Sequence, residues 1–157
     1  MRKILLAGLM AASLTACAGR PFTATTYRPQ GLLGGYSEKE IEPGIWKVTG
    51  NSNGIAEMGF GRNMAAYRAA ELMASKGFTH VQILDQKGSA RSVGYGGGSM
   101  SHAGETMVLT VRGANSPASP TDCRAKNPSA CITVEAASVM ASLGPQLHIG
   151  EGKAPAQ

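Results

Sequence analysis

The first twenty residues determine how much of this chain is available to build a folded domain. Arg2 and Lys3 are followed by an uncharged run over residues 4–19 that ends in small residues. A cationic start, a short apolar stretch and small residues before a cleavage site are typical of a secretory signal. The apolar stretch is shorter than the roughly 20 residues that a membrane-spanning helix needs. We therefore predict that residues 1–16 form a signal that is removed on export.

The end of this signal carries a more specific pattern. Leu14-Thr15-Ala16-Cys17 resembles the lipobox of bacterial lipoproteins, in which a Leu precedes two small residues and an obligatory Cys. The resemblance implies that the Cys17 thiol receives a diacylglyceryl group, that the chain is cut before Cys17, and that the new amine is acylated, for example by palmitate. An incidental Cys beside an apolar helix is the alternative. Two or three acyl chains give stable anchoring, whereas one binds only marginally.

The residue after the anchor bears on the final location. In lipoproteins an Asp at this position retains the protein in the inner membrane, and this chain has Ala18 instead. The resemblance therefore implies an outer-membrane lipoprotein that faces the periplasm. Membrane lipid, through acylated Cys17, is then one expected partner.

The charge of the chain is modest once the signal is removed. Lysines and arginines fall from 15 to 13 against 10 acidic residues, so the net charge falls from +5 to +3. The remaining cations are scattered and include no block of five or six, which a nucleic-acid tail would show. Because an exported protein also has no routine access to nucleic acid, we do not expect a nucleic-acid partner.

The remaining two cysteines are expected to pair. Cys123 and Cys131 flank a turn-rich stretch, and an exported protein matures in an oxidising compartment. A disulfide closing so short a loop would stabilise the fold by about 2.5 kcal/mol on the chain-entropy model. Two free thiols are the next alternative. A redox pair or half of a metal site is disfavoured because the spacing is not C-x-x-C and no His lies beside it.

Periodicity predicts a short list of elements. Residues 17–43 are rich in Pro, Gly and Thr and are predicted to be a lipid-anchored tether, although Tyr27 and residues 34–37 could dock on the domain. Residues 45–49 alternate as a strand in which Trp46 would be a core anchor. A helix should end at Lys76, with Gly77 as its stop and Arg68 and Glu71 as an i, i+3 pair on its polar face.

The second half of the chain adds two strands and a helix. Strands are predicted at 80–84 and 106–112, separated by a mobile Gly- and Ser-rich loop over 88–104 with a short strand near 91–95. Thr133 should cap a last helix that ends at Gly144-Pro145. The order β-α-β-β-α favours an α+β two-layer sandwich of three or four mainly antiparallel strands with two helices on one face. We predict a periplasmic domain over 44–149 and a disordered tail over 150–157.

Several short segments of this domain match a known pattern. Gly34-Gly35-Tyr36-Ser37, Trp46-Lys47-Val48, the turn at Gly50-Asn51, Tyr67-Arg68-Ala69-Ala70-Glu71-Leu72 and Gly77-Phe78 together resemble a family of proteobacterial lipoproteins. The resemblance covers roughly residues 14–147, and the Tyr-Arg-Ala-Ala-Glu-Leu helix is its most specific part. The family has no assigned activity, so the resemblance implies location and architecture and supplies no catalytic residue. The Cys123 and Cys131 pair lies outside the family pattern.

Residues able to carry chemistry do not form a recognisable set. Residues 59–62 open a helix, where amides attract anions, but the third glycine of a dinucleotide fingerprint is missing. His80, His102 and His148 are too dispersed to predict a metal site, even with Asp85 or Glu105. Ser99 lacks a nucleophile-elbow pattern. We therefore expect no catalytic residue, no metal and no cofactor.

These observations favour a non-catalytic binding or envelope-maintenance lipoprotein with an unknown ligand. An envelope protein or cell-wall material would be its second partner. One alternative is an envelope hydrolase, which would require Ser99, His102 and acids near Glu105 to meet in one cleft. The other is a redox or stress sensor that uses Cys123 and Cys131.

Overall fold

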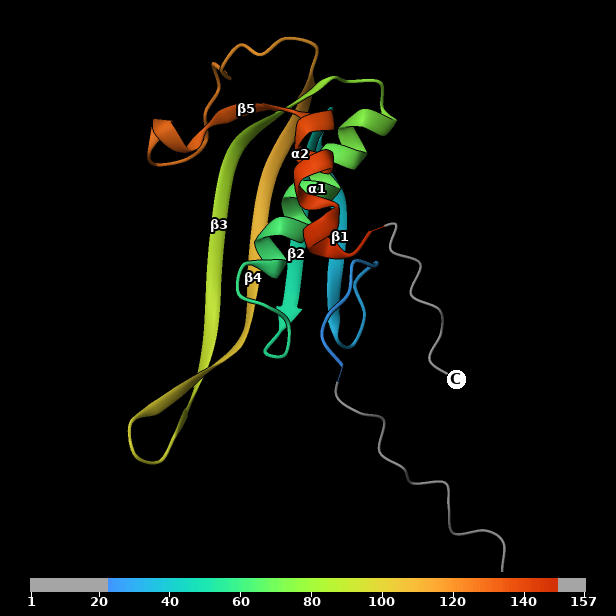
Figure 1. Ribbon diagram of the computed structural model, residues 1–157. Helices are drawn as coiled ribbons and strands as arrows, with labels where there is room; N and C mark the ends of the chain where they lie inside the picture. The colour runs from blue at the N-terminus through green and yellow to red at the C-terminus, as the bar shows by residue number, and fades with distance from the viewer. Residues whose placement is uncertain (1–22, 150–157) are drawn as a thin grey trace, which may run out of the picture.

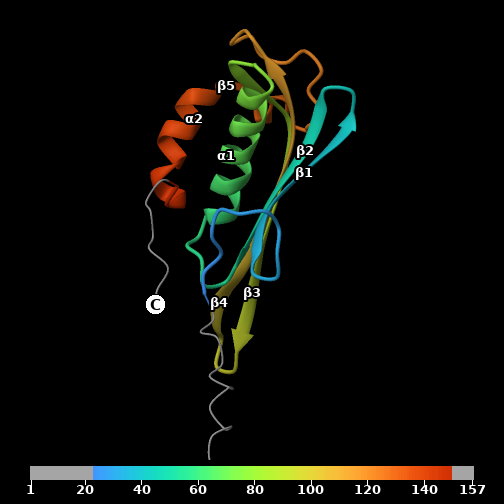
Figure 2. The same ribbon diagram turned by 90° about the vertical axis from the view of Figure 1, so that its right-hand side faces the viewer.

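The computed structural model describes residues 23–149, which form a five-stranded antiparallel open sheet with two α-helices packed on one face (Figures 1 and 2). The strand order is β1-β2-β4-β3-β5, so β4 is the central strand. The elements are β1 (Gly34–Glu42), β2 (Ile45–Asn53), α1 (Phe60–Ser75), β3 (His80–Tyr95), β4 (Ser99–Ala114), β5 (Ile132–Glu135) and α2 (Ala136–Leu143). Two 3₁₀ turns, Pro128–Ala130 and Pro145–Leu147, precede β5 and follow α2.

The first helix is positioned by small residues on the face that it turns to the sheet. Ala65, Ala69 and Ala70 are fully buried there between the larger Met64 and Met73. On the sheet, Gly50 lies so close to α1 that a Cβ would fall 2.1 Å from the Gly61 carbonyl oxygen. The helix therefore rests almost directly on the backbone of β2.

The predicted end of this helix is confirmed. Gly77 has a positive φ of 86°, its amide donates to the Ala74 carbonyl, and the Phe78 amide donates to the Met73 carbonyl. This pair of bonds is a Schellman motif, in which glycine avoids the strain that a side chain would suffer at positive φ. Arg68 and Glu71 form the expected i, i+3 ion pair.

The core lies between α1 and the central strands. Val48, Val81, Leu109 and Val111 point from the sheet into one buried cluster with the apolar face of α1. Trp46, predicted as the core anchor, is only half-buried at the margin of this cluster, and the Lys76 ammonium lies 4.2 Å from the centre of its ring. The alternation over 45–49 is thus confirmed, but Trp46 covers the core instead of filling it.

The α+β class and the two helices on one face agree with the expectation, whereas the number of strands does not. The sheet has five strands in the order β-β-α-β-β-β-α, and residues 34–42, expected within the tether, form edge strand β1. The folded unit thus begins well before residue 44. Its polar sequence hid β1, because only Gly34 and Gly35 at its start are buried and its last four residues are exposed.

The glycine-rich region over 88–104 is also different from the prediction. It is the outer half of a long β3–β4 hairpin, with the turn at residues 96–98 between the paired Tyr95 and Ser99. Backbone hydrogen bonds join these strands, and such bonds do not require apolar side chains. The short predicted strands at 80–84 and 106–112 are therefore the inner parts of two 16-residue strands.

The predicted cap of the last helix is also wrong. Thr133 lies within β5, which pairs with β3, and the helix begins three residues later at Ala136 with Glu135 as its N-cap. The β-branched run Ile132-Thr133-Val134 favours an edge strand over the first turn of a helix.

Candidate functional site

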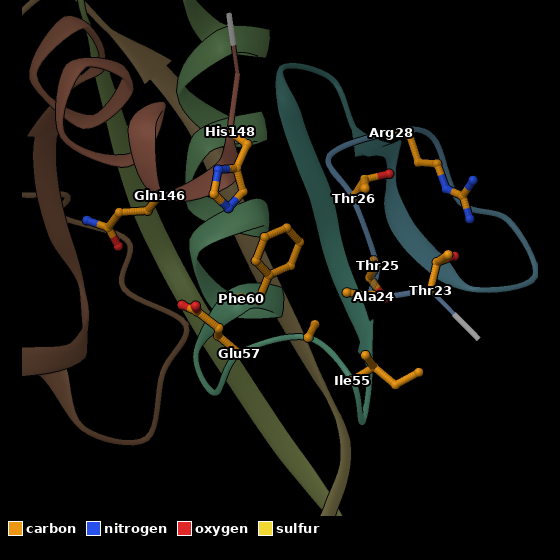
Figure 3. A pocket seen from close by; sticks show the side chains of 11 residues that line it. Thr23, Ala24, Thr25, Thr26, Arg28, Ile55, Glu57, Phe60, Gln146 and His148 are labelled. Carbon is orange, nitrogen blue, oxygen red and sulfur yellow. The ribbon is translucent and has the colours of Figure 1, made fainter. Parts of the chain in front are cut away.

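A pocket of about 600 Å³ lies where the N-terminal segment meets the start of α1 and the end of the described chain (Figure 3). Its walls come from three separate parts of the chain, the segment 23–28, the β2–α1 connection and the 3₁₀ turn after α2. The lining residues are Thr23, Ala24, Thr25, Thr26, Arg28, Ile55, Ala56, Glu57, Phe60, Gln146 and His148.

The lining combines an aromatic centre with polar groups around it. Phe60 lies in the middle of the view in Figure 3, with Arg28 toward one side and Glu57 toward the other. Phe60 is also part of a second buried cluster with Met64 and Leu147, so its ring is held in place by the helix and the 3₁₀ turn. Such a mixture suits binding of a small amphipathic group, with the aromatic ring as its apolar contact.

Three tyrosines from distant positions pack against the same buried cluster as Phe60. The ring centres of Tyr27 and Tyr36 are 4.7 Å apart, and those of Tyr27 and Tyr67 are 5.0 Å apart with the rings nearly perpendicular. Edge-to-face and tilted contacts of this kind are favourable beyond simple burial. They pack the N-terminal segment against β1 and α1, which is why residues 23–33 follow the surface of the domain.

An ion-pair network completes this cluster. Arg68 on α1 donates two hydrogen bonds to Glu38 on β1, at 2.6 and 3.1 Å, and also pairs with Glu71. The Tyr27 hydroxyl donates to the Glu71 carboxylate at 2.6 Å, and the Arg68 guanidinium lies 4.7 Å from the centre of the Tyr36 ring. The network therefore joins β1, α1 and the N-terminal segment.

The environment changes the proton affinities of two members of the network. Burial, together with the neighbouring Glu71 carboxylate, raises the pKa of the Tyr27 hydroxyl far above its usual range. The hydrogen bond to Glu38 raises the pKa of the Arg68 guanidinium, against a smaller opposing effect of burial. Tyr27 therefore stays a hydrogen-bond donor and Arg68 stays a cation under any physiological condition.

These contacts give Arg68 and Glu71 a structural role. The sequence predicted only that these two side chains would pair on the polar face of the helix. The side chains of Arg68 and Glu38 are only 20% and 25% exposed, and their ion pair links helix α1 to strand β1. Tyr36, Tyr67, Arg68 and Glu71 thus lie in one cluster that joins β1 to α1.

The start of α1, considered above as an anion site, is occupied by a side chain of the protein. The buried Glu105 carboxylate on β4 accepts hydrogen bonds from the amides of Gly59, at 3.2 Å, and Arg62, at 3.1 Å. Free amides at a helix start attract negative charge, and Glu105 supplies it internally. Residues 59–62 are therefore an ordinary helix start whose amides bind a side chain of the same protein.

The disulfide Cys123–Cys131 is present, with 5.7 Å between the two Cα atoms. The preceding loop crosses the sheet face opposite the helices, where Ala118 accepts hydrogen bonds from Gln82 and Thr133, and Asp122 pairs with Arg112. The amides of Arg124 and Ala125 donate to the carbonyl of Leu84, which lies at a bulge in β3. The disulfide thus closes a loop that is docked on the sheet.

The residues that the hydrolase alternative requires do not meet in one cleft. Ser99 is at the β3–β4 turn, His102 lies opposite Ser92 farther along the hairpin, and both Glu105 oxygens accept amide hydrogen bonds at α1. His80 begins β3 and contacts Thr79, while His148 follows the last 3₁₀ turn. Within residues 23–149 no group of three His, Cys, Asp or Glu side chains is close enough to hold a metal ion.

Cys17, predicted as the lipid anchor, lies outside the described residues, as do the signal predicted over 1–16 and the tail predicted over 150–157. In the described part of the chain, none of the helices has the length and hydropathy needed to cross a bilayer. Comparisons with protein-family models, with curated proteins and with solved structures found no match.

Sequence reasoning missed the roles of two residues in these sites. Glu38 was assigned to the tether, and Glu105 was considered only as a catalytic acid or a metal ligand. The docking of Tyr27 on the domain was an open alternative, and its contacts with Tyr36, Tyr67 and Glu71 confirm it. For Glu105 the sequence did hold a signal. It is the one carboxylate in β4, and helix α1 has no acidic residue in its first turn to pair with the free amides there. No periodicity predicts which distant strand supplies such a carboxylate.

Proposed function

We propose that this protein is an outer-membrane lipoprotein, anchored through acylated Cys17, that presents a non-catalytic binding domain to the periplasm. The observation that carries the proposal is the lipobox-like Leu14-Thr15-Ala16-Cys17 at the end of a signal-type segment. The disulfide Cys123–Cys131 supports an oxidising compartment, weakly, because disulfides are rare in proteins of the reducing cytosol.

The pocket beside Phe60 supports a binding role. It brings an aromatic side chain, an arginine and a carboxylate to one opening, which suits a small amphipathic ligand or a chain segment of an envelope partner. Glu105 and Arg68 are used in holding the fold, so we assign neither of them a catalytic role.

Intact-mass analysis of the protein purified from bacterial membranes tests the anchor. We expect a mature chain that starts at Cys17 and is heavier by two or three acyl chains. A Cys17→Ser variant should lose this added mass and its membrane association. An unmodified wild-type chain would overturn the lipoprotein proposal. Fractionation of inner and outer membranes from the same cells then tests the location.

The binding role is tested by Phe60→Ala against Phe78→Ala, using the lipidated protein to retain envelope material in a pull-down. Phe78 packs on Gly113 and lies outside the pocket, so it is the matched aromatic control. We expect loss of retained material only for Phe60→Ala. Equal retention by both variants and the wild type would contradict a role for the pocket.

A further inference from the structure

Exposed apolar side chains gather at one end of this molecule. Single exposed apolar residues are ordinary on soluble proteins, so their distribution matters more than their presence. Within residues 23–149 seven large hydrophobic side chains are exposed, and five of them lie at the end of the sheet where β2 terminates. We call this the apolar end, and its members are Leu32, Ile55, Met58, Val93 and Met100.

The strand register places these five residues toward the same end of the sheet, with Val93 and Met100 on the projecting hairpin. Asn53, the last residue of β2, pairs with Gly104, and beyond that pair the β3–β4 hairpin alone continues. The connection that carries Ile55 and Met58 leaves the sheet at this point, and Leu32 precedes the start of β1, where Gly34 pairs with Ser52. Both ribbon views show the β2–α1 connection and the segment before β1 toward the same end of the sheet, with the hairpin turn projecting beyond both (Figures 1 and 2).

The tip of the hairpin is apolar on both faces. Val93 pairs with Ser101 and Gly94 pairs with Met100, so Val93 and Met100 occupy successive positions on the ladder. Successive positions of a strand point to opposite faces of a sheet. Met100 is 70% exposed, Met58 is 81% exposed and Leu32 is fully exposed, which leaves apolar area with nothing to cover it within the described residues.

The chain enters the domain at this same end. The carbonyl of Thr23 accepts a hydrogen bond of 2.8 Å from the side-chain amide of Asn53, and the adjacent Thr25 is also bonded to Asn53. Six residue steps separate Thr23 from Cys17, and a fully extended chain of that length reaches about 20 Å. A lipid anchor at Cys17 therefore keeps the apolar end close to the bilayer.

The charges at this end fit an anionic lipid surface. Arg28, Arg62 and Arg91 are exposed there beside the exposed carboxylate of Glu57. Cations around a small set of exposed apolar side chains are typical of segments that lie in a membrane interface.

We propose that the apolar end is the membrane-contacting surface of the anchored protein, with the β3–β4 tip reaching into the interface of the lipid bilayer. This inference rests on the proposed anchor at Cys17. The anchor and the hairpin tip would then hold the domain in one orientation, with the β1–β2 turn, the disulfide loop and β5 directed away from the membrane.

Tryptophan fluorescence in vesicles with brominated phospholipids tests this orientation, because bromine in the acyl chains quenches only nearby indoles. The full lipidated chain would carry Trp46→Phe together with either Met100→Trp or Ile41→Trp. Ile41 is the matched control, since it is exposed near the opposite end of the sheet. We expect Met100→Trp to lose about half of its fluorescence and Ile41→Trp to lose almost none. Should Trp46→Phe impair folding, the same variants with Trp46 retained allow the comparison, since Trp46 adds an equal background to both.

The outcomes separate this inference from the proposed function. If both variants bind vesicles through acylated Cys17 and neither is quenched, or both are quenched equally, the orientation is wrong and the anchor stands. If the chain lacks acyl groups and does not bind vesicles, both proposals are overturned. If it lacks acyl groups but Met100→Trp is still quenched, the membrane-contacting surface stands and the anchor does not.

Discussion

At the scale of single residues, Arg68 connects parts of the chain whose contact the helical periodicity does not predict. It contacts Glu38 on β1, Glu71 on its own helix and the ring of Tyr36. Partly buried charges of this kind depend on one another, because the loss of one partner leaves the others without compensation. The polar residues of the Tyr67-Arg68-Ala69-Ala70-Glu71-Leu72 segment thus attach β1 and the N-terminal segment to α1.

Replacement of Arg68 should lower stability markedly. We expect Arg68→Met to reduce the free energy of unfolding by about 1–3 kcal/mol, because Glu38 and Glu71 lose their cation while remaining half-buried. Urea unfolding measures the change. Arg124→Gln is the control, since the side chains of its pair with Glu42 are 34% and 51% exposed and the pair should contribute less than that of Arg68. Equal destabilisation by both substitutions would contradict the assignment.

Tyr27 should make stability depend on pH in the alkaline range. Its pKa is raised in the folded state, so the folded protein holds this proton more tightly than the unfolded chain. The stabilisation is present below the ordinary tyrosine pKa of about 10 and is lost progressively as the pH rises above it. We expect Tyr27→Phe to be less stable by about 1–2 kcal/mol at neutral pH, because it lacks the hydrogen bond to Glu71.

The gap between wild type and Tyr27→Phe should then narrow as the pH rises above about 10. Unfolding curves of both proteins over this range measure the gap directly, since lysine titration affects both equally. A gap that stays constant with pH would show that Tyr27 does not carry the proton linkage.

At the scale of elements, the close approach of α1 to β2 and the docking of the disulfide loop are the two arrangements that shape the domain. The first requires the absence of a side chain at Gly50, and the second requires Cys123 and Cys131 to meet. Both bring together elements that are separate along the chain, so each can be tested by one local substitution.

Gly50→Ala should force α1 away from the sheet. A Cβ at this position would overlap the Gly61 carbonyl and crowd the Ala65 amide, both of which are helix backbone. Overpacking against rigid atoms costs about 1–3 kcal/mol, which thermal unfolding would detect. Gly94→Ala is the control because its Cβ would enter open space. A variant as stable as wild type would mean that the two elements separate at no cost.

Removal of the disulfide should reduce stability without altering the fold. We expect Cys123→Ala with Cys131→Ala to lose about 2.5 kcal/mol, because the unfolded chain regains the freedom of the closed loop. Treatment of wild type with a strong reductant should give the same shift, and the double variant should not respond. Reduction under mild conditions, with the fold intact, would instead favour the redox-sensor alternative.

At the scale of the whole molecule, the domain has a packed half and a projecting half. The helices cover the inner part of the sheet, while the β3–β4 hairpin extends beyond the last residue of β2 (Figure 2). Among residues 23–149, no strand pairs with either side of the projecting tip beyond the Asn53 and Gly104 pair. It should therefore contribute to surface contacts more than to stability.

Shortening the hairpin should leave the domain folded. We expect replacement of residues 93–101 by Asn-Gly to change the free energy of unfolding by less than about 1 kcal/mol, since little core is lost and the new turn suits a two-residue connection. Thermal unfolding and circular dichroism check this result. Cooperative loss of the fold would show that the tip stabilises the sheet.

Local pattern alone predicts the α+β class, helix α1 with its stop at Gly77, the alternation over 45–49 and the pairing of Cys123 with Cys131. These features depend on neighbours along the chain or on a small choice of partners. Tertiary structure alone decided that residues 34–42 are an edge strand, that the glycine-rich region is a hairpin, and that Glu105 occupies the start of α1. Backbone pairing tolerates polar and glycine-rich sequences, and a buried carboxylate is matched to its amides only by the folded geometry. The contacts of Glu105 join residues more than 40 positions apart, whose identities do not record their partners. Edge strand β1 and the hairpin tip pair with near neighbours, but through backbone bonds that need no apolar alternation in the sequence.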